Sequence, residues 1–296
     1  MAVPKVECVL DARASVGEGA IWSATELALY WVDIPQGLLQ RFDPVTGQNQ
    51  SWQMNEPAGC FALCQSGRII VALTSGFWEF DPGTGQKTRL SGPEPGALGH
   101  RFNDGTVDQA GRFLAGTMPL AGASEQDSNG TLYSLDSDLI LREVMRGFHV
   151  INGLAFSPDG RTAYVSDSFP SIRTIWACDY DLDDGALTGR RVFFDTRAVA
   201  GRPDGGAVDA QGCYWMAGVG GWQLVRITPE GRVDMEIPMP VEKPTRIAFG
   251  GRDLDTLFVT SIGTGLSEGP RQPQAGGLFA LRVPGVTGAP FPVMKR

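Results

Sequence analysis

The fold of this chain is decided by residues 151–168, INGLAFSPDGRTAYVSDS, and by imperfect copies of this stretch elsewhere in the sequence. The stretch contains a polar residue, Asn152, then a short apolar run, the turn Pro158-Asp159-Gly160 and a second apolar run. Alternating apolar runs separated by such turns are typical of antiparallel β-strands. The stretch therefore predicts a β-hairpin, and its copies predict a protein built from repeated hairpins.

Six copies of the unit follow one another along the chain, at a period of roughly 40–50 residues. In each copy a short strand comes before a pair of longer strands, and no long stretch has the apolar period of a helix. Antiparallel units repeating at this spacing are typical of propeller blades. The strand pairs are Ala28–Ile34 with Leu38–Asp43, Gly67–Leu73 with Phe77–Asp81, Gly111–Thr117 with Thr131–Asp136, Thr162–Asp167 with Thr174–Tyr180, Cys213–Val219 with Gln223–Thr228, and Thr256–Ile262 with Gly277–Val283.

A β-sandwich would also contain many short strands, but it would not explain a polar residue that returns at one point of the repeat. We therefore predict an all-β fold, a six-bladed β-propeller with four-stranded antiparallel blades around a central channel, as a single domain over residues 1–296. The spare strand Lys5–Leu10 is expected to pair with the last blade, because this would close the ring and remove an exposed sheet edge.

One position of the repeat points to function. With the copies aligned on their turns, it is occupied by Glu18, Gly59, Asn103, Asn152, Asp204 and Thr245. The innermost strand of each blade lines the channel, so these side chains are expected to converge on one cavity. Glu18, Asn152 and Asp204 offer hard oxygen ligands, suited to Ca²⁺, Mg²⁺ or Mn²⁺, with Zn²⁺ or Fe²⁺ as alternatives. Each of the three could instead cap a turn beside a glycine, but that role does not require a shared repeat position.

The third inner strand adds two possible substrate contacts. Arg101 and Asn103 are expected to reach the same channel, where they would donate hydrogen bonds to a carbonyl or to hydroxyl groups. Arg101 could alternatively form a surface salt bridge. Asp104 could steady a neighbouring donor or hold the turn. These residues extend the predicted site from metal ligands to substrate contacts.

Composition narrows the class of protein. A net charge of −8 argues against nucleic acid as a partner. The N-terminus lacks the apolar core of a signal peptide, and no run reaches membrane-spanning length. The five cysteines are scattered and odd in number, which favours reduced thiols and a cytoplasmic protein. Two histidines are too few for a histidine-based zinc site, and no Gly-x-Ser-x-Gly elbow is present.

Several segments together resemble the senescence-marker-protein/gluconolactonase (regucalcin-like) family of sugar lactonases. The matching segments are Gly17–Trp22, Arg101–Gly105 with Asp108–Arg112, Ala115–Met118, Asn152–Ser157 and Arg202–Gly205. The resemblance implies a six-bladed propeller that holds one divalent cation, with Ca²⁺ as the first expectation, through Glu18, Asn152 and Asp204. It also implies substrate contacts from Arg101 and Asn103, and hydrolysis of sugar lactones such as gluconolactone.

On this interpretation the cation would stabilise the oxyanion, while Asp204 as general base, or the metal itself, would activate water. One departure from the family pattern is Pro119-Leu120-Ala121, where a polar substrate contact is often found. Residues 121–129 could form a rim loop, and Arg173 could be a rim contact or a surface residue. Two other functions stay open: a non-catalytic calcium-binding or scaffold propeller, and a metal-dependent esterase for non-sugar esters with an apolar mouth. Candidates for that mouth are Phe77, Trp78 and Trp222.

Overall fold

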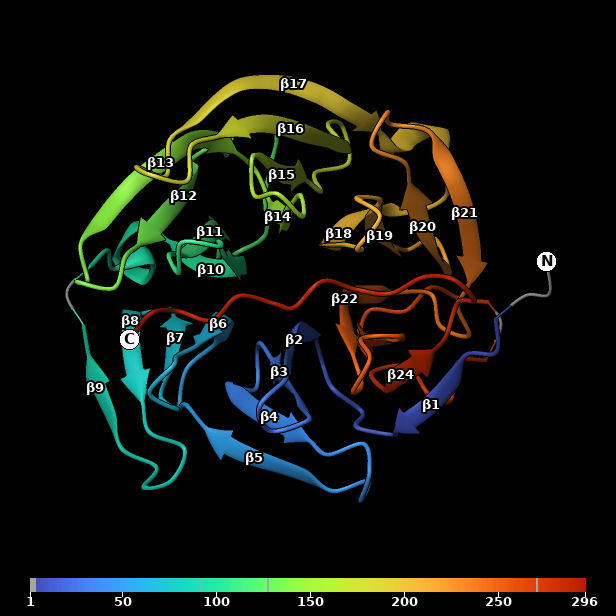
Figure 1. Cartoon of the computed structure of the whole chain (residues 1–296), viewed down its shortest axis with the longest axis horizontal. Helices are drawn as coiled ribbons and strands as arrows, with labels where there is room; N and C mark the ends of the chain where they lie inside the picture. Colours follow the sequence, from blue (N-terminus) through green and yellow to red (C-terminus); the bar gives the residue numbers. More distant parts are fainter. Residues whose placement is uncertain (1–3, 91, 127, 270) are drawn as a thin grey trace.

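The computed structural model describes residues 4–90, 92–126, 128–269 and 271–296. Six antiparallel sheets of four strands each stand around a common axis, as the ring in Figure 1 shows. Helix in the described chain is limited to two 3₁₀ turns, η1 (Pro95–Leu98) and η2 (Thr196–Ala198). The predicted six-bladed β-propeller is confirmed.

Each blade has an inner strand, two middle strands and an outer strand. The inner strands are β2 (Gly17–Ser23), β6 (Ala58–Leu63), β10 (His100–Val107), β14 (Ile151–Phe156), β18 (Arg202–Val208) and β22 (Pro244–Gly250). The second strands are β3 (Ala28–Asp33), β7 (Ile69–Leu73), β11 (Phe113–Pro119), β15 (Thr162–Asp167), β19 (Tyr214–Val219) and β23 (Thr256–Ser261). The third strands are β4 (Leu38–Phe42), β8 (Gly76–Phe80), β12 (Gly130–Leu135), β16 (Thr174–Tyr180), β20 (Gln223–Ile227) and β24 (Leu278–Leu281). The outer strands are β5 (Asn49–Gln53), β9 (Lys87–Arg89), β13 (Leu141–Phe148), β17 (Leu187–Asp195), β21 (Val233–Pro238) and β1 (Glu7–Leu10).

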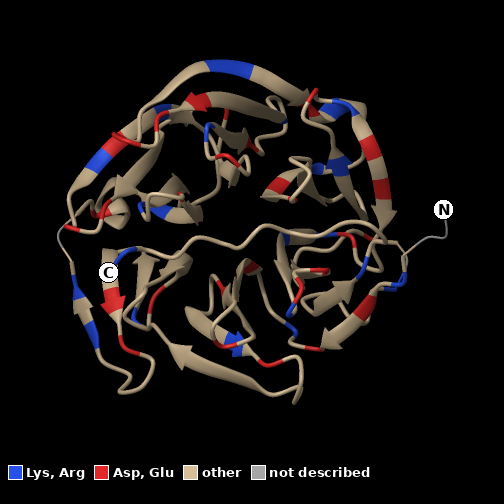
Figure 2. Cartoon of the chain, in the orientation of Figure 1, with Lys and Arg blue, Asp and Glu red and all other residues tan. Residues whose placement is uncertain are grey.

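Burial falls from the axis outward. Strands β2, β6 and β22 are buried along their whole length, whereas β5 and β9 are mostly exposed or half-buried. Aromatic side chains fill the spaces between neighbouring blades, as where Phe102 of one blade lies 4.7 Å from Phe77 of the next, ring centre to ring centre. The apolar residues of the middle strands therefore hold the blades together, and charged residues of both signs are interspersed around the ring (Figure 2).

The ring is closed by the two ends of the propeller sequence. Strand β1 pairs with β24 in an antiparallel register that places Cys8 opposite Phe279, as predicted for the N-terminal strand. A second contact joins the last blade to the first, where the Thr245 hydroxyl donates to the backbone carbonyl of Gly17. The seam therefore combines a completed sheet with a hydrogen bond between inner strands.

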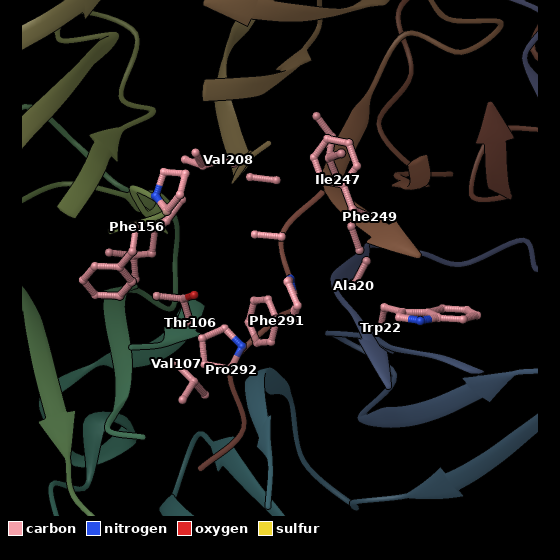
Figure 3. Close-up of a pocket in the computed structure, with 18 of the residues that line it drawn as sticks. Ala20, Trp22, Thr106, Val107, Phe156, Val208, Ile247, Phe249, Phe291 and Pro292 are labelled. Carbon is pink, nitrogen blue, oxygen red and sulfur yellow. The ribbon is translucent and has the colours of Figure 1, made fainter. Parts of the chain in front are cut away.

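The C-terminal segment, residues 284–296, crosses the axis of the ring (Figure 1). Backbone hydrogen bonds attach it to residues that follow the inner strands, including Ala210 N–H to Thr287 and Met294 N–H to Leu63. A cavity of about 90 Å³ lies between this segment and the second halves of the inner strands, with Phe156, Phe249 and Phe291 in its wall (Figure 3). The segment therefore covers one end of the channel. In the described chain no helix has the length and apolar character needed to cross a membrane.

Candidate metal and substrate site

The register of every inner strand breaks beside the polar repeat position. The shifts fall between Glu18 and Ile21, Ala58 and Cys60, Phe102 and Gly105, Asn152 and Ala155, Pro203 and Gly206, and Pro244 and Ile247. A bulge of this kind re-aims a side chain out of the regular strand alternation. Two glycines that follow ligand candidates, Gly19 and Gly153, have φ angles of +63° and +65°, which glycine adopts without steric cost. The repeat therefore encodes the backbone geometry that turns these side chains toward the axis.

Glu18 and Asp204 meet in the channel although they belong to blades far apart in sequence. They are only 7% and 6% exposed, and each carboxyl group shifts the pKa of the other, which places them close together. Burial, and then the charge of Asp104, raises the pKa of Glu18 to about 7. Burial, and then the charge of Glu18, raises the pKa of Asp204 well above its usual range. Ionising both carboxyl groups costs free energy, because two negative charges would face each other in a buried site. A bound cation would offset this cost.

The amide of Asn152 is held in one orientation. Its Nδ2 donates to the hydroxyl of Ser168 at 2.7 Å, and that hydroxyl donates to the carbonyl of Pro203, next to Asp204. With Nδ2 occupied in this way, Oδ1 is the atom left to accept hydrogen bonds or to coordinate a cation. Ser168 was not predicted from the sequence, because it follows β15 and has no repeat signature of its own.

Arg101 and Asn103 join the same network from the third blade. The Arg101 Nη1 donates to Oδ1 of Asn103 at 2.8 Å, and Nδ2 of Asn103 donates to Oδ1 of Asn152 at 2.9 Å. Burial lowers the pKa of Arg101 to about 10, so its guanidinium stays charged at neutral pH. Asn103 therefore links Arg101 to a ligand candidate, and both predicted substrate contacts lie beside the two carboxyl groups.

The other two copies of the repeat position have structural roles. Thr245 forms the hydrogen bond to Gly17 at the ring seam. At Gly59 a Cβ atom would lie 2.3 Å from the backbone of Phe102, so the neighbouring inner strand leaves no room for a side chain. Of the six aligned residues, the three predicted as ligands and Asn103 belong to the site, and Gly59 and Thr245 support the surrounding backbone.

Two aspartates that the sequence did not single out fix the strand starts. Asp33, at the end of β3, accepts the backbone N–H of Val16 at 3.0 Å. Asp167, at the end of β15, accepts the N–H of Val150 at 3.1 Å. Each of these N–H groups lies two residues before a ligand candidate. The recurrence of an aspartate at the end of the second strand was the signal that could have revealed this role.

Asp104 stabilises the interior of the site and does not line its opening. It is 3% exposed, and its Oδ1 lies 2.7 Å from Nη1 of Arg246 on the sixth blade. Its Oδ2 accepts the backbone N–H of Leu154 at 3.0 Å. Both roles considered from the sequence are seen, because Oδ1 also accepts the backbone N–H of Gly105 at 2.8 Å.

The rim predictions have separate outcomes. Arg173 is not free, because its Nη2 donates to backbone carbonyls of the segment that precedes β18. The loop 121–129, of which residue 127 lies outside the described residues, follows Pro119, which pairs with His100 at the start of β10. The loop thus leaves its blade at the end of the channel where the site lies. The proposed apolar mouth is not supported by Phe77, which is fully buried in the core.

The donor set fits a hard divalent cation. The described residues hold no group of three or more His, Cys, Asp or Glu side chains arranged for a metal ion. The site instead offers two buried carboxylates and the oriented amide oxygen of Asn152, and water or substrate oxygens would complete the coordination. A set that contains only oxygen favours Ca²⁺, Mg²⁺ or Mn²⁺ over softer metals.

A protein-family model described as the SMP-30/gluconolactonase/LRE-like region matches residues 16–263. The chain is 40% identical to a 6-deoxy-6-sulfogluconolactonase of Pseudomonas putida over 281 residues, with 94% of each chain covered. It is 35% identical to regucalcin of Xenopus laevis, with 96% of each chain covered. Among solved structures, a calcium-binding regucalcin of Agrobacterium tumefaciens superposes with a TM-score of 0.90 at 25% identity, covering 100% of this chain and 98% of the other.

The fold thus places the chain in the class of six-bladed β-propellers. The chain belongs to the SMP-30/gluconolactonase family, as its sequence resemblance indicated. Within that family its relatives include both a named sugar lactonase and proteins named for calcium, so the family supports a sugar lactonase without settling metal dependence.

Proposed function

We propose that this protein is a metal-dependent lactonase that opens aldonolactones, such as gluconolactone, to the aldonic acid. The observation that carries the proposal is the meeting of two buried carboxyl groups with an oriented amide oxygen and a charged arginine at one end of the channel. A relative with 40% identity is named as a sulfogluconolactonase, which supports a sugar lactone as the substrate.

Glu18, Asn152 and Asp204 would hold the cation, with Ca²⁺ as the first candidate and Zn²⁺, Mn²⁺, Mg²⁺ or Fe²⁺ as alternatives. When bound, a divalent cation polarises an ester carbonyl and lowers the pKa of coordinated water. The hydrogen bond that Nδ2 of Asn152 donates to the Ser168 hydroxyl keeps the Asn152 oxygen directed at the site. The carboxyl of Glu18 is also fixed, because its Oε2 accepts the N–H of Gly19 at 2.9 Å.

In the proposed reaction a water oxygen attacks the lactone carbonyl carbon, and the ring carbon–oxygen bond then breaks. Asp204 is the candidate acceptor for the water proton, which passes to the departing ring oxygen to give the hydroxyl of the aldonic acid. The raised pKa of Asp204 favours proton uptake, although cation binding would lower its basicity, so activation of water by the metal is the alternative. Arg101 would donate to the oxygen that gains negative charge, and Asn103 holds Arg101 in place.

A non-catalytic calcium-binding propeller is the second candidate, and it is favoured by the regucalcin relatives, one of which is described as a calcium-binding protein. Binding alone does not require Arg101 beside the two carboxyl groups, and this arrangement favours the enzyme. For the compartment we propose the cytoplasm, supported by five cysteines that are all free.

The test uses protein stripped of metal with a chelator, reloaded with single cations and assayed by pH indicator on a panel of aldonolactones. We expect turnover only after reloading, and Asp204→Ala should lose both cation binding and turnover. Arg101→Ala should bind the cation normally and lose rate. Tight calcium binding with no turnover on any lactone would favour the non-catalytic candidate, and full activity of Asp204→Ala would refute the site.

A further inference from the structure

Arg202 is a cation beside the site that has no partner among the described residues. It begins β18, is exposed, and lies two residues before Asp204. Its side chain forms no hydrogen bond or ion pair with any other residue that the structure describes. Most exposed arginines have no specific function. We therefore use the position of Arg202 in the repeat to determine whether it faces the substrate.

The register gives Arg202 the same place in its blade as Arg101. Arg101 pairs with Met118 of its second strand and Arg202 with Val219, and both pairs come just before the bulge of the inner strand. Arg101 reaches Asn103, two residues further along the chain, at 2.8 Å, and Arg202 stands at the same distance in sequence before Asp204. Arg202 therefore extends from the face that carries Asp204, and its positive charge lowers the pKa of that carboxyl, against the larger effect of burial.

The backbone segment that leads to Arg202 is held in place by hydrogen bonds from Arg173. Nη2 of Arg173 donates to the carbonyls of Thr196 at 2.9 Å, Val199 at 3.2 Å and Gly201. The segment leading into β18 is thereby held against the fourth blade, although it contains only the short turn η2. A side chain projecting from a fixed backbone loses little freedom when it binds, which suits substrate recognition.

The net charge of the chain makes the positive charge of Arg202 relevant to substrate binding. The chain carries a net charge of −8, so a negatively charged substrate needs a local positive group to approach the site. Arg101 is committed to Asn103 and to the carbonyl of Phe102 through Nη1. Arg202 is the neighbouring arginine whose guanidinium is uncommitted, and a guanidinium pairs with sulfonate, phosphate or carboxylate oxygens in a two-point geometry.

We propose that Arg202 binds an anionic group at the end of an aldonolactone remote from the ring ester, so that the enzyme prefers negatively charged lactones over neutral ones. This inference rests on the proposed lactonase function and adds the substrate class to it. Because the contact is remote from the bond that breaks, its loss should raise KM for charged lactones more than it lowers kcat.

The test compares wild type, Arg202→Gln and Arg202→Lys on glucono-lactone and on its 6-phosphate, 6-deoxy-6-sulfonate and 6-carboxylate counterparts. We expect wild type to prefer at least one charged lactone, and Arg202→Gln to lose about 10- to 100-fold in kcat/KM for it and less than about twofold for glucono-lactone. Arg202→Lys should keep part of the preference, since it keeps the charge. Arg197→Gln removes an exposed arginine that is already paired with Asp195 and serves as the matched control.

A binding measurement separates this inference from the lactonase proposal. Calorimetric titration of cation-loaded and stripped protein with 6-phosphogluconate and gluconate should show weaker 6-phosphogluconate binding only in the Arg202 variants, and the difference should shrink with added salt. Equal losses for charged and neutral lactones, or a wild type without preference, would overturn the role of Arg202 and leave the lactonase intact. Charge-selective binding without turnover on any lactone would instead overturn the lactonase. Circular dichroism of each variant checks its fold.

Discussion

Arg246 and Asp104, which are 142 residues apart in sequence, form a buried ion pair of 2.7 Å in the middle of the channel. The pair joins the sixth blade to the third, and the hydrogen bond from Leu154 N–H adds the fourth. Both side chains are 3% exposed or less. The pair separates the polar site from the apolar cavity beneath it, because Arg246 lines that cavity while the charge of Asp104 acts on Glu18.

We expect Arg246→Met to lower the free energy of unfolding by about 3–5 kcal/mol, because Asp104 would remain as an unpaired buried charge. The double variant Arg246→Met/Asp104→Leu should recover part of this loss, since no charge is left without a partner. Urea unfolding of the two single variants and the double variant measures the coupling. Additive effects of the two substitutions would show that the pair does not act as a unit.

Removal of the Ser168 hydroxyl should loosen the metal site without touching a ligand. In Ser168→Ala the Nδ2 of Asn152 loses its 2.7 Å partner, and we expect cation affinity to fall about 10-fold or more, as for other groups that orient metal ligands. Ser166→Ala is the matched control, because the Ser166 hydroxyl is buried without a hydrogen-bond partner in the described chain. Calorimetric cation titration compares the two, and equal affinities would contradict the orienting role.

Cation binding should depend on pH through Glu18. Burial, followed by the charge of Asp104, raises its pKa from 4.5 to about 7, so below neutral pH a cation must displace a proton. We expect apparent affinity to rise up to about tenfold per pH unit from about pH 5.5 to about pH 7. Titration in buffers of different ionisation enthalpy would count the released protons. Constant affinity over this range would mean that Glu18 is already ionised.

The raised pKa of Glu18 also affects the stability of the metal-free protein, which we expect to fall as the pH rises. The folded-state pKa of Glu18 lies above its ordinary value, so the protonated carboxyl favours the folded state. This contribution is complete below about pH 4.5 and is lost as the pH rises through about 7. We expect saturating cation to raise the melting temperature more at about pH 8 than at about pH 5.5.

Gly59 should be intolerant of any side chain. In Gly59→Ala the new Cβ would lie 2.3 Å from the backbone of Phe102, and relief of this overlap requires the second and third inner strands to separate. Overpacking of a buried position typically costs about 1–3 kcal/mol. Gly269→Ala is the control, since a Cβ there meets no atom of the described residues within 4 Å. Thermal unfolding of both variants tests the prediction, and equal melting temperatures would contradict it.

The sequence was sufficient for the inner strands, because the polar residue, the short apolar run and the turn recur together in each repeat. It did not reveal the outer strands clearly: β9 is only Lys87–Arg89, and exposed strands lack the apolar alternation that marks buried ones. Nor did it reveal Ser168 or Arg246, whose partners are set by the arrangement of blades around the axis rather than by local pattern. The C-terminal segment, residues 284–296, was missed for a similar reason, since its place across the axis depends on contacts with distant strand ends.

Closure of the ring by β1 and β24 has a consequence for biosynthesis. The N-terminal strand emerges from the ribosome long before its partner at residues 278–281. The last blade therefore cannot form until these residues have been made, and until then the nascent chain must carry an open arc of blades with an unpaired edge. Assembly of the complete metal site, which needs the first, fourth and fifth inner strands held in one circle, is thus expected to follow the synthesis of the last blade.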